Sequence, residues 1–402
     1  MSILDKAISL VDVEHLYQHI LALEGEKHSL DSYDALIRGA SYIKEICTNY
    51  GLDVLEYPIL VPGIKKDFYN VAAFLNITLK SEPAILITSH YDTVAGTPGA
   101  DDNASAIAIM LEIARIFKSL DYNHNLIFVS FNLEEWAPNF QQHIRKIGRV
   151  AGVYDSKFRF TSYRVKQAYE IFMRLLRKNI YNKQYLDHDG FEKFHDEVSP
   201  LKLTPSEHQF FIELNNFYIK QGEYDPLGTS FVLGSSTFAQ TASESMVLKA
   251  VLNLDTIGYT SKNPNSQTLP SGMSLEIFER YNLNEQEMIG DFASIIADDK
   301  SGFLAKSFLK NAQHASINLP CAILTVPLDY SAIKQNFPDL LRSDHAPFWK
   351  HGIPALLISD SANFRNPYYH TGGDTIATLD FPFIKKVCQT TIATIIDLVQ
   401  EL

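Results

Sequence analysis

Two histidines and several carboxylates stand where predicted strands end or where the next helix begins. They are His90, Asp92, Asp101, Asp102, Glu134, Glu135, Asp255 and His370. Because open α/β sheets bind their ligands at the carboxyl ends of the strands, these side chains are expected to converge. Mixed nitrogen and oxygen donors suit zinc or another divalent first-row metal. The residues therefore predict a metal centre.

Each of these features, taken alone, has a less specific explanation. A His-x-Asp sequence is common in solvated loops, and the Asp101-Asp102 pair could cap the helix that follows it. The Glu134-Glu135 pair comes soon after the apolar run 126–131, where ionised groups are costly unless they are paired or bound to metal. It is the ordered combination of all these features that favours a functional site over these separate explanations.

Short apolar runs alternate with helical periodicities along most of the chain. Strands are predicted at 54–60, 69–75, 84–89, 125–131, 247–254, 322–326 and 355–359. Helices are predicted at 3–23, 32–50, 104–120, 284–296, 304–311 and 381–402. This alternation predicts an α/β fold with a mixed, mostly parallel central sheet that has helices on both faces.

The sequence changes in character between Pro138 and Pro226. This segment is rich in Lys, Arg, Tyr and Phe, shows no pattern of a buried strand, and has helical periodicity at 163–178 and 206–221. We interpret residues 1–402 as one α/β domain with an insertion at about 138–226. Because aromatic residues are typical of interfaces, the insertion is expected to form a lid or a contact in a homo-oligomer.

Composition excludes several classes of protein. The chain has 402 residues, of which 46% are hydrophobic, and its net charge is −12 without a basic stripe, so nucleic acid is not an expected partner. No apolar run approaches the roughly 20 residues of a membrane span, and the N-terminus does not read as a signal peptide. Three widely spaced cysteines, Cys47, Cys321 and Cys388, argue against a disulfide framework. A cytoplasmic location is therefore predicted.

Six short motifs resemble, in their order, those of the co-catalytic zinc aminopeptidases, a superfamily that also contains the glutaminyl cyclases. The motifs are His90-Tyr91-Asp92, Gly99-Ala100-Asp101-Asp102-Asn103-Ala104-Ser105, Leu133-Glu134-Glu135, Asp255-Thr256-Ile257-Gly258-Tyr259, Ser343-Asp344-His345-Ala346-Pro347-Phe348 and Tyr369-His370-Thr371. The resemblance covers residues of about 65–137 and 230–382. It implies the zinc-exopeptidase fold, a three-layer sandwich of the phosphorylase/hydrolase-like kind.

The resemblance also implies a ligand set for two zinc ions, although other divalent first-row metals are compatible with it. Asp101 corresponds to the carboxylate that bridges the two ions. Glu135 and His370 would complete the ligands of one ion, and His90 and Asp255 those of the other.

Further roles follow from the same resemblance. Glu134 is expected to act as the general base and acid, and Asp92 to orient the imidazole of a ligand from behind. Asp102 and Asp344 are expected beside the ligands. The peptide bond between Asp101 and Asp102 is expected to be cis.

The predicted function is that of a zinc metallo-aminopeptidase, an enzyme that hydrolyses peptides and releases their N-terminal amino acids. A glutaminyl cyclase is the first alternative, because it uses nearly the same ligand positions. A carboxypeptidase, a dipeptidase or a non-catalytic peptide-binding relative are further alternatives. The expected partner is a peptide substrate, and neither nucleic acid nor a membrane is expected.

Overall fold

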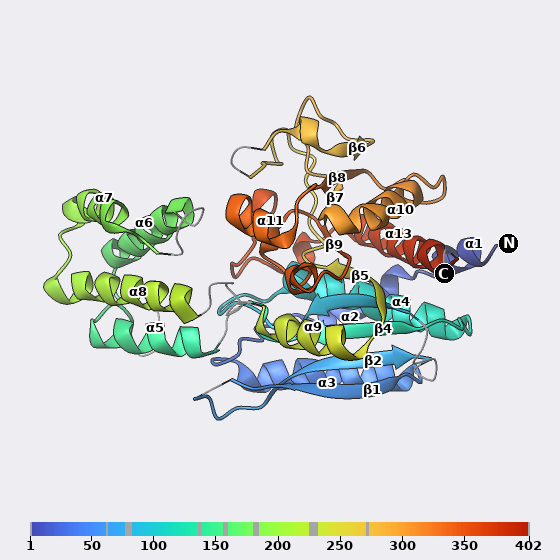
Figure 1. Ribbon diagram of the computed structural model, residues 1–402, viewed down its shortest axis with the longest axis horizontal. Coiled ribbons are helices and arrows are strands. Elements are labelled where there is room, and N and C mark those ends of the chain that lie inside the picture. Colours follow the sequence, from blue (N-terminus) through green and yellow to red (C-terminus); the bar gives the residue numbers. More distant parts are fainter. Residues whose placement is uncertain are drawn as a thin grey trace.

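The computed structural model describes residues 2–61, 63–76, 83–135, 138–155, 160–179, 185–224, 232–270 and 273–400. Within these ranges the body of the protein is built on a nine-stranded sheet with the order β1-β2-β4-β3-β5-β9-β7-β8-β6 (Figure 1). The strands are β1 (Asp53–Ile59), β2 (Phe68–Leu75), β3 (Ala84–His90), β4 (Leu126–Phe131), β5 (Leu248–Leu254), β6 (Glu279–Tyr281), β7 (Ala293–Ala297), β8 (Cys321–Thr325) and β9 (Ala355–Ser359).

The sheet is mixed, and its parallel part is the centre. Strands β4, β3, β5 and β9 are parallel neighbours, and β7 and β8 form a further parallel pair. The remaining pairs, β1 with β2, β2 with β4, β7 with β9 and β6 with β8, are antiparallel. The predicted mixed α/β fold is confirmed, although within the described residues only four of the eight strand pairs are parallel. All seven residues of β3 are buried, because helices cover both faces of the sheet there.

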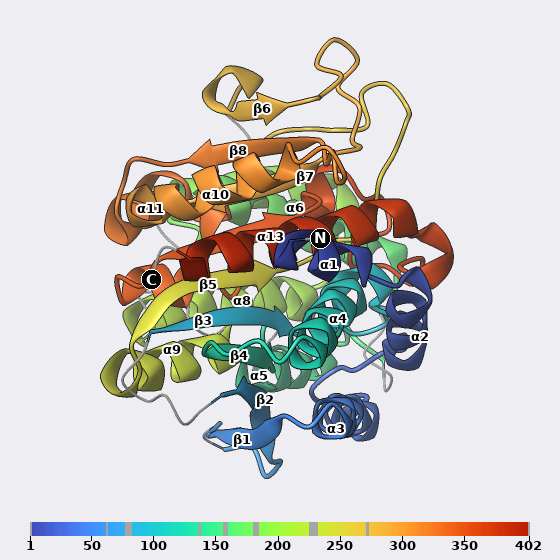
Figure 2. The same cartoon turned by 90° about the vertical axis from the view of Figure 1, so that its right-hand side faces the viewer.

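Helices form a layer on each face of the sheet, and each layer has its own apolar core (Figure 2). One layer contains α1 (Ile3–Ser9), α2 (Val13–Leu23), α3 (Tyr33–Asn49), α4 (Ala106–Ser119), α10 (Gly302–Ala312) and α13 (Phe381–Gln400). The other contains α9 (Leu233–Ser245), α11 (Tyr330–Asn336) and α12 (Ala346–Lys350). In the described ranges, no helix has both the length and the apolar character that crossing a bilayer requires.

Two local predictions are wrong. The helix predicted at 3–23 is divided into α1 and α2, because Asp12 accepts a hydrogen bond from the backbone N–H of Glu14 at 2.8 Å and starts a new helix. The helix predicted at 284–296 is a loop followed by strand β7. Its apolar run is short and contains isoleucines, and β7 completes its backbone hydrogen bonds by pairing with β8 and β9.

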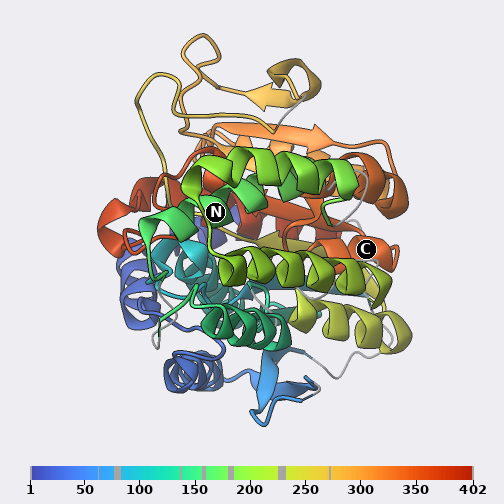
Figure 3. The ribbon, with the colours of Figure 1, turned by 90° about the vertical axis from the view of Figure 1, so that its left-hand side faces the viewer.

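A group of helices stands beside the sheet, within the segment interpreted as an insertion (Figures 1 and 3). It consists of α5 (Pro138–Val150), α6 (Tyr163–Asn179), α7 (His188–Val198) and α8 (Pro205–Tyr224). Aromatic residues such as Phe172, Phe194 and Phe211 form a core of its own. The predicted boundary at Pro226 lies outside the described residues. The roles predicted for this helical group, a lid or an oligomer contact, stay predictions.

Candidate metal centre

Most of the expected ligands lie at the carboxyl ends of the central parallel strands, at one edge of the sheet. His90 is the last residue of β3, Glu134 and Glu135 follow β4, and Asp255 follows β5 directly. Because β4, β3 and β5 are parallel neighbours, their carboxyl ends lie side by side. His370 comes from the loop between β9 and α13 and meets them at the same edge.

A carboxylate lies between the two imidazoles, and it belongs to Asp102. Its Oδ1 is 3.2 Å from Nε2 of His90, and its Oδ2 is 3.1 Å from Nε2 of His370. Asp102 lies in the π-helical turn η1 (Ala100–Ser105), which Gly99 enters with a left-handed φ of 69°. All three side chains are largely buried, with His370 the most exposed at 29%.

Asp101, which the sequence motif assigned to the bridging position, points elsewhere. Its side chain is buried, and its Oδ2 accepts a hydrogen bond from Nδ2 of Asn366 at 2.6 Å. Neighbouring residues of the turn project in different directions, so only one of the two aspartates faces the imidazoles. The cis peptide bond is likewise one residue later than expected, between Asp102 and Asn103.

The other carboxylates surround the same imidazoles at longer or equal distances. Oε1 of Glu135 is 3.1 Å from Nε2 of His370, and Oδ1 of Asp255 is 3.5 Å from Nε2 of His90. Oε2 of Glu134 is 3.9 Å from the same His90 atom. Two groups of three ligand atoms lie within 4.8 Å of one another, namely those of His90, Asp102 and Glu135 and those of His90, Glu134 and Asp255.

Asp92 holds the surrounding backbone in place. Its Oδ1 and Oδ2 accept hydrogen bonds from the backbone N–H groups of Glu134 and Glu135, both at 3.2 Å. The same Oδ1 is 3.6 Å from Nδ1 of His90. Asp92 therefore lies beside this imidazole, and it also aligns the Glu134-Glu135 pair.

Asp374 supports the neighbouring turn, a contact that the sequence reasoning missed. Its carboxylate accepts from the backbone N–H of Asp101 at 2.8 Å and of Asp102 at 3.2 Å. Asp344, expected beside the ligands, is buried, and this burial raises its pKa to about 7. His345 is also buried and its Nε2 bonds the backbone carbonyl of Leu340, which indicates a structural role.

Crowding of buried carboxylates shifts the pKa values throughout the centre. Burial and the nearby Asp102 raise the pKa of Glu135 to about 8, and burial raises that of Glu134 well above its usual value. Burial lowers the pKa of His370, but Glu135 and Asp102 outweigh this effect and raise it to about 10. Because these acidic groups are costly to keep ionised together without cations, the donor set fits the binding of divalent metal.

The sequence analysis assigned no role to two further residues at this edge. The ring of Tyr369 stacks on His370 with centroids 3.7 Å apart, and burial raises the pKa of Tyr369 well above its usual value, so its hydroxyl is a donor. Tyr369, Asp255 and Arg342 all line one pocket with about 890 Å³ of open space. The only sequence signal was the position of each residue. Tyr369 directly precedes His370, and Arg342 directly precedes the Ser343-Asp344 motif.

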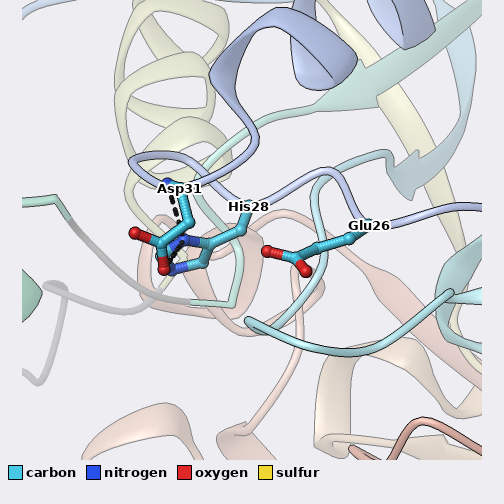
Figure 4. A group of neighbouring side chains, drawn as sticks. All are labelled: Glu26, His28 and Asp31. Atoms are coloured by element: carbon cyan, nitrogen blue, oxygen red, sulfur yellow. Dashed lines mark hydrogen bonds and ion pairs between the residues drawn. The ribbon is translucent and has the colours of Figure 1, made fainter. Parts of the chain in front are cut away.

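A second group of possible ligands lies in the loop between α2 and α3 (Figure 4). It consists of Glu26, His28 and Asp31. Asp31 forms an ion pair with Arg145 of α5, and Oγ of Ser32 donates a hydrogen bond to Glu26 at 2.7 Å. Since both carboxylates already have partners, we assign this group to the contact between the body and the helical group.

The fold is α/β, and the site brings together histidine and carboxylate side chains that could hold a metal ion. The sequence profile of Peptidase family M28 matches residues 70–185 and 325–395, which contain the expected ligands except Asp255. Over these two ranges the chain is similar to Peptidase family M28, as the motifs predicted.

Curated relatives are similar to the whole or to a part of this chain. The chain is 25% identical over 372 residues to the uncharacterized protein YfbL of Escherichia coli, covering 89% of this chain and 79% of that protein. A 57-residue stretch is 40% identical to aminopeptidase YwaD of Bacillus subtilis, covering 14% of this chain and only 12% of that protein.

Among solved structures, the fold is similar to the LapA aminopeptidase of Legionella pneumophila. The TM-score is 0.56 at 16% identity, over 99% of this chain and 75% of that one. It is similar to the glutaminyl cyclase of Porphyromonas gingivalis as well, with a TM-score of 0.53 at 15% identity over 98% and 99% of the two chains. Both similarities concern the fold.

Proposed function

We propose that this protein is a metallo-aminopeptidase that holds two zinc ions, or two other divalent first-row metal ions, with Asp102 as their shared ligand. Glu135 and His370 would complete the ligands of one ion, and His90 and Asp255 those of the other. The observation that carries this proposal is the carboxylate of Asp102 between two imidazoles, at 3.2 and 3.1 Å, with a further carboxylate beside each imidazole.

The ions, when bound, polarise the scissile carbonyl group and make a water molecule more acidic. The chain itself supplies the proton transfers. Glu135 is 3.1 Å from Nε2 of His370, whereas Glu134 is 3.9 Å from Nε2 of His90, so we assign the proton transfers to Glu134, the more distant of the two carboxylates. Its carboxylate accepts a proton from water and then delivers it to the leaving amine.

A glutaminyl cyclase is the second candidate, because the fold is similar to that of a cyclase over almost the whole of both chains. A cyclase would use nearly the same carboxylates for a different outcome, in which the α-amine of an N-terminal glutamine attacks its own side-chain amide and releases ammonia. The two candidates therefore differ in product and not in ligand set.

The decisive experiment compares two substrates on the metal-loaded enzyme, leucine p-nitroanilide and a peptide with N-terminal glutamine. We expect release of p-nitroaniline, and a shortened peptide without pyroglutamate. Glu134→Gln should keep its metal and lose about 10²–10⁴-fold in kcat, because it removes the general base. Glu135→Gln is the matched variant and should lose metal together with activity. Pyroglutamate as the sole product, or near-normal kcat in Glu134→Gln, would contradict the proposal.

Two lesser predictions complete this picture. The helical group α5–α8 is proposed to restrict access to the centre or to join subunits. A reducing, cytoplasmic location is proposed because Cys47, Cys321 and Cys388 are all buried and free.

A further inference from the structure

The pocket beside Asp255 has apolar walls and a charged rim. Its walls include Leu269, Phe278 and Phe292, and they extend over the sheet face at β7 and β8. Its charged lining residues, within the described part of the chain, are Asp255, Asp339 and Arg342. The pocket therefore joins the metal centre to one positive charge.

The guanidinium of Arg342 has N–H donors that remain available to a ligand. Its Nη1 donates to Oδ1 of Asn363 at 3.0 Å, while the nearest oxygen of Asp339 is 4.0 Å away, too far for a hydrogen bond. A guanidinium has five N–H donors in a planar fork. Because 45% of the side-chain surface of Arg342 is exposed, a ligand in the pocket can reach this fork.

The charge of Arg342 is close enough to act on the centre. Partial burial lowers its pKa, but nearby acidic groups, Asp339 among them, outweigh this effect and raise it. Glu134 and Glu135 contribute in the same direction. Tyr369, which stacks on the expected ligand His370, lines the same pocket as Arg342.

Two other cations near the centre cannot meet a substrate. Lys27 is 4% exposed, and its Nζ donates to the backbone carbonyls of Leu23 and Gly25 at 2.6 and 2.8 Å. Arg365 is 5% exposed and its Nε donates to Gln267 at 2.8 Å. Among the described residues at this edge, Arg342 is the accessible partner for an anion.

We propose that Arg342 binds the free C-terminal carboxylate of a short peptide, so that dipeptides and tripeptides are the preferred substrates. The proposal rests on the peptide hydrolysis proposed above. The carboxylates of the centre attract the N-terminal ammonium group of a peptide and repel its C-terminal carboxylate. A guanidinium fork matches a carboxylate in shape and charge, and it offsets that repulsion at one place. In a short peptide both ends fall within the site, whereas in a long one the carboxylate lies far outside it.

The test compares kcat/KM for Leu-Leu with kcat/KM for Leu-Leu amide on the zinc-loaded enzyme. We expect the free acid to be cleaved about 10–100-fold better, the usual effect of one charge-assisted pair. In Arg342→Gln this ratio should fall to about 1, and in Arg342→Lys it should be intermediate, because the charge stays and the fork is lost. Arg280→Gln is the matched control, since Arg280 pairs with Glu285 away from the pocket and should keep the wild-type ratio.

The outcomes separate this proposal from the one on which it rests. Equal cleavage of the acid and the amide by the wild-type enzyme would overturn carboxylate recognition while leaving peptide hydrolysis intact. A preference for the acid that persists in Arg342→Gln would also overturn it, because the carboxylate would then bind elsewhere. Failure to cleave either dipeptide, together with cyclisation of N-terminal glutamine, would instead contradict the proposed function.

Discussion

Charged side chains are paired and buried differently in the metal centre and in the helical group α5–α8. In the helical group, charges are paired in partly exposed ion pairs, such as Arg164 with Glu207 at 2.7 Å, over a core of aromatic rings. At the edge of the sheet, carboxylates are buried close to one another around two imidazoles. The first arrangement stabilises a helical unit by itself. The second is costly to keep ionised without cations, which is why we place the chemistry there.

The largest expected effect comes from Asp102, where the difference between the two regions is most pronounced. Asp102→Asn removes the negative charge between the two imidazoles, so both ions should bind more weakly. We expect loss of most bound metal and a decrease in kcat/KM of about 10³-fold or more, since removal of a general base alone costs about 10²–10⁴-fold. Metal content by plasma mass spectrometry and kcat/KM on leucine p-nitroanilide measure both.

Asp101→Asn is the matched control, because the residue is adjacent in the chain and equally buried. Its carboxylate bonds Asn366 and does not face an imidazole. We expect Asp101→Asn to keep its metal, with a loss of activity much smaller than that of Asp102→Asn. A reversal, in which Asp101→Asn loses the metal and Asp102→Asn keeps it, would restore the role that the sequence motif assigned.

An intermediate effect is expected for Asp92, which supports the centre without facing the ions. Asp92→Ala removes the acceptor of two backbone hydrogen bonds at 3.2 Å and the carboxylate beside His90. Loss of such a supporting group typically costs about 10–100-fold in metal affinity or activity. Titration with a zinc chelator measures the affinity.

Asp329→Ala serves as the comparison for Asp92→Ala. Asp329 also accepts a backbone hydrogen bond, from Ala332 at 2.9 Å, but it does so at the start of α11. We expect this variant to lose about 0.5–2 kcal/mol of stability to unfolding and no zinc affinity. Equal zinc affinity in both aspartate variants would show that Asp92 does not support the centre.

The smallest effect is expected where the helical group meets the body. Arg145→Ala breaks the ion pair with Asp31, and partly exposed pairs of this kind contribute about 0–1 kcal/mol. We expect kcat/KM on leucine p-nitroanilide to change less than about 2-fold, while limited proteolysis of the helical group becomes faster. Arg164→Ala, which breaks a pair inside the group, is the control for general loosening. Loss of metal in Arg145→Ala would show that the two regions are not independent.

Much of the centre could be predicted from the sequence because strand ends are simple to locate. His90, Glu135 and Asp255 follow apolar runs, and the parallel sheet brings such ends together whatever the details of the loops. Asp101 and Asp102 could not be told apart in this way. Which of two adjacent carboxylates faces inward depends on the backbone of the π-helical turn, and composition and periodicity carry no information about it.

Other features depended on contacts between segments far apart in the chain. The strand β7 was predicted as part of a helix, because a short apolar run fits both structures until its neighbours β8 and β9 are known. Arg342 and Tyr369 became candidate functional residues only because they line the same pocket as Asp255. Single residues of this kind have no pattern that a sequence can reveal.

The most direct test of the central claim is anomalous X-ray diffraction from zinc-loaded crystals at the zinc absorption edge. We predict two anomalous peaks in each chain, one on either side of the Asp102 carboxylate, with His90 beside one peak and His370 beside the other. A single peak at full zinc loading, or a pair of peaks bridged by Asp101, would contradict the account.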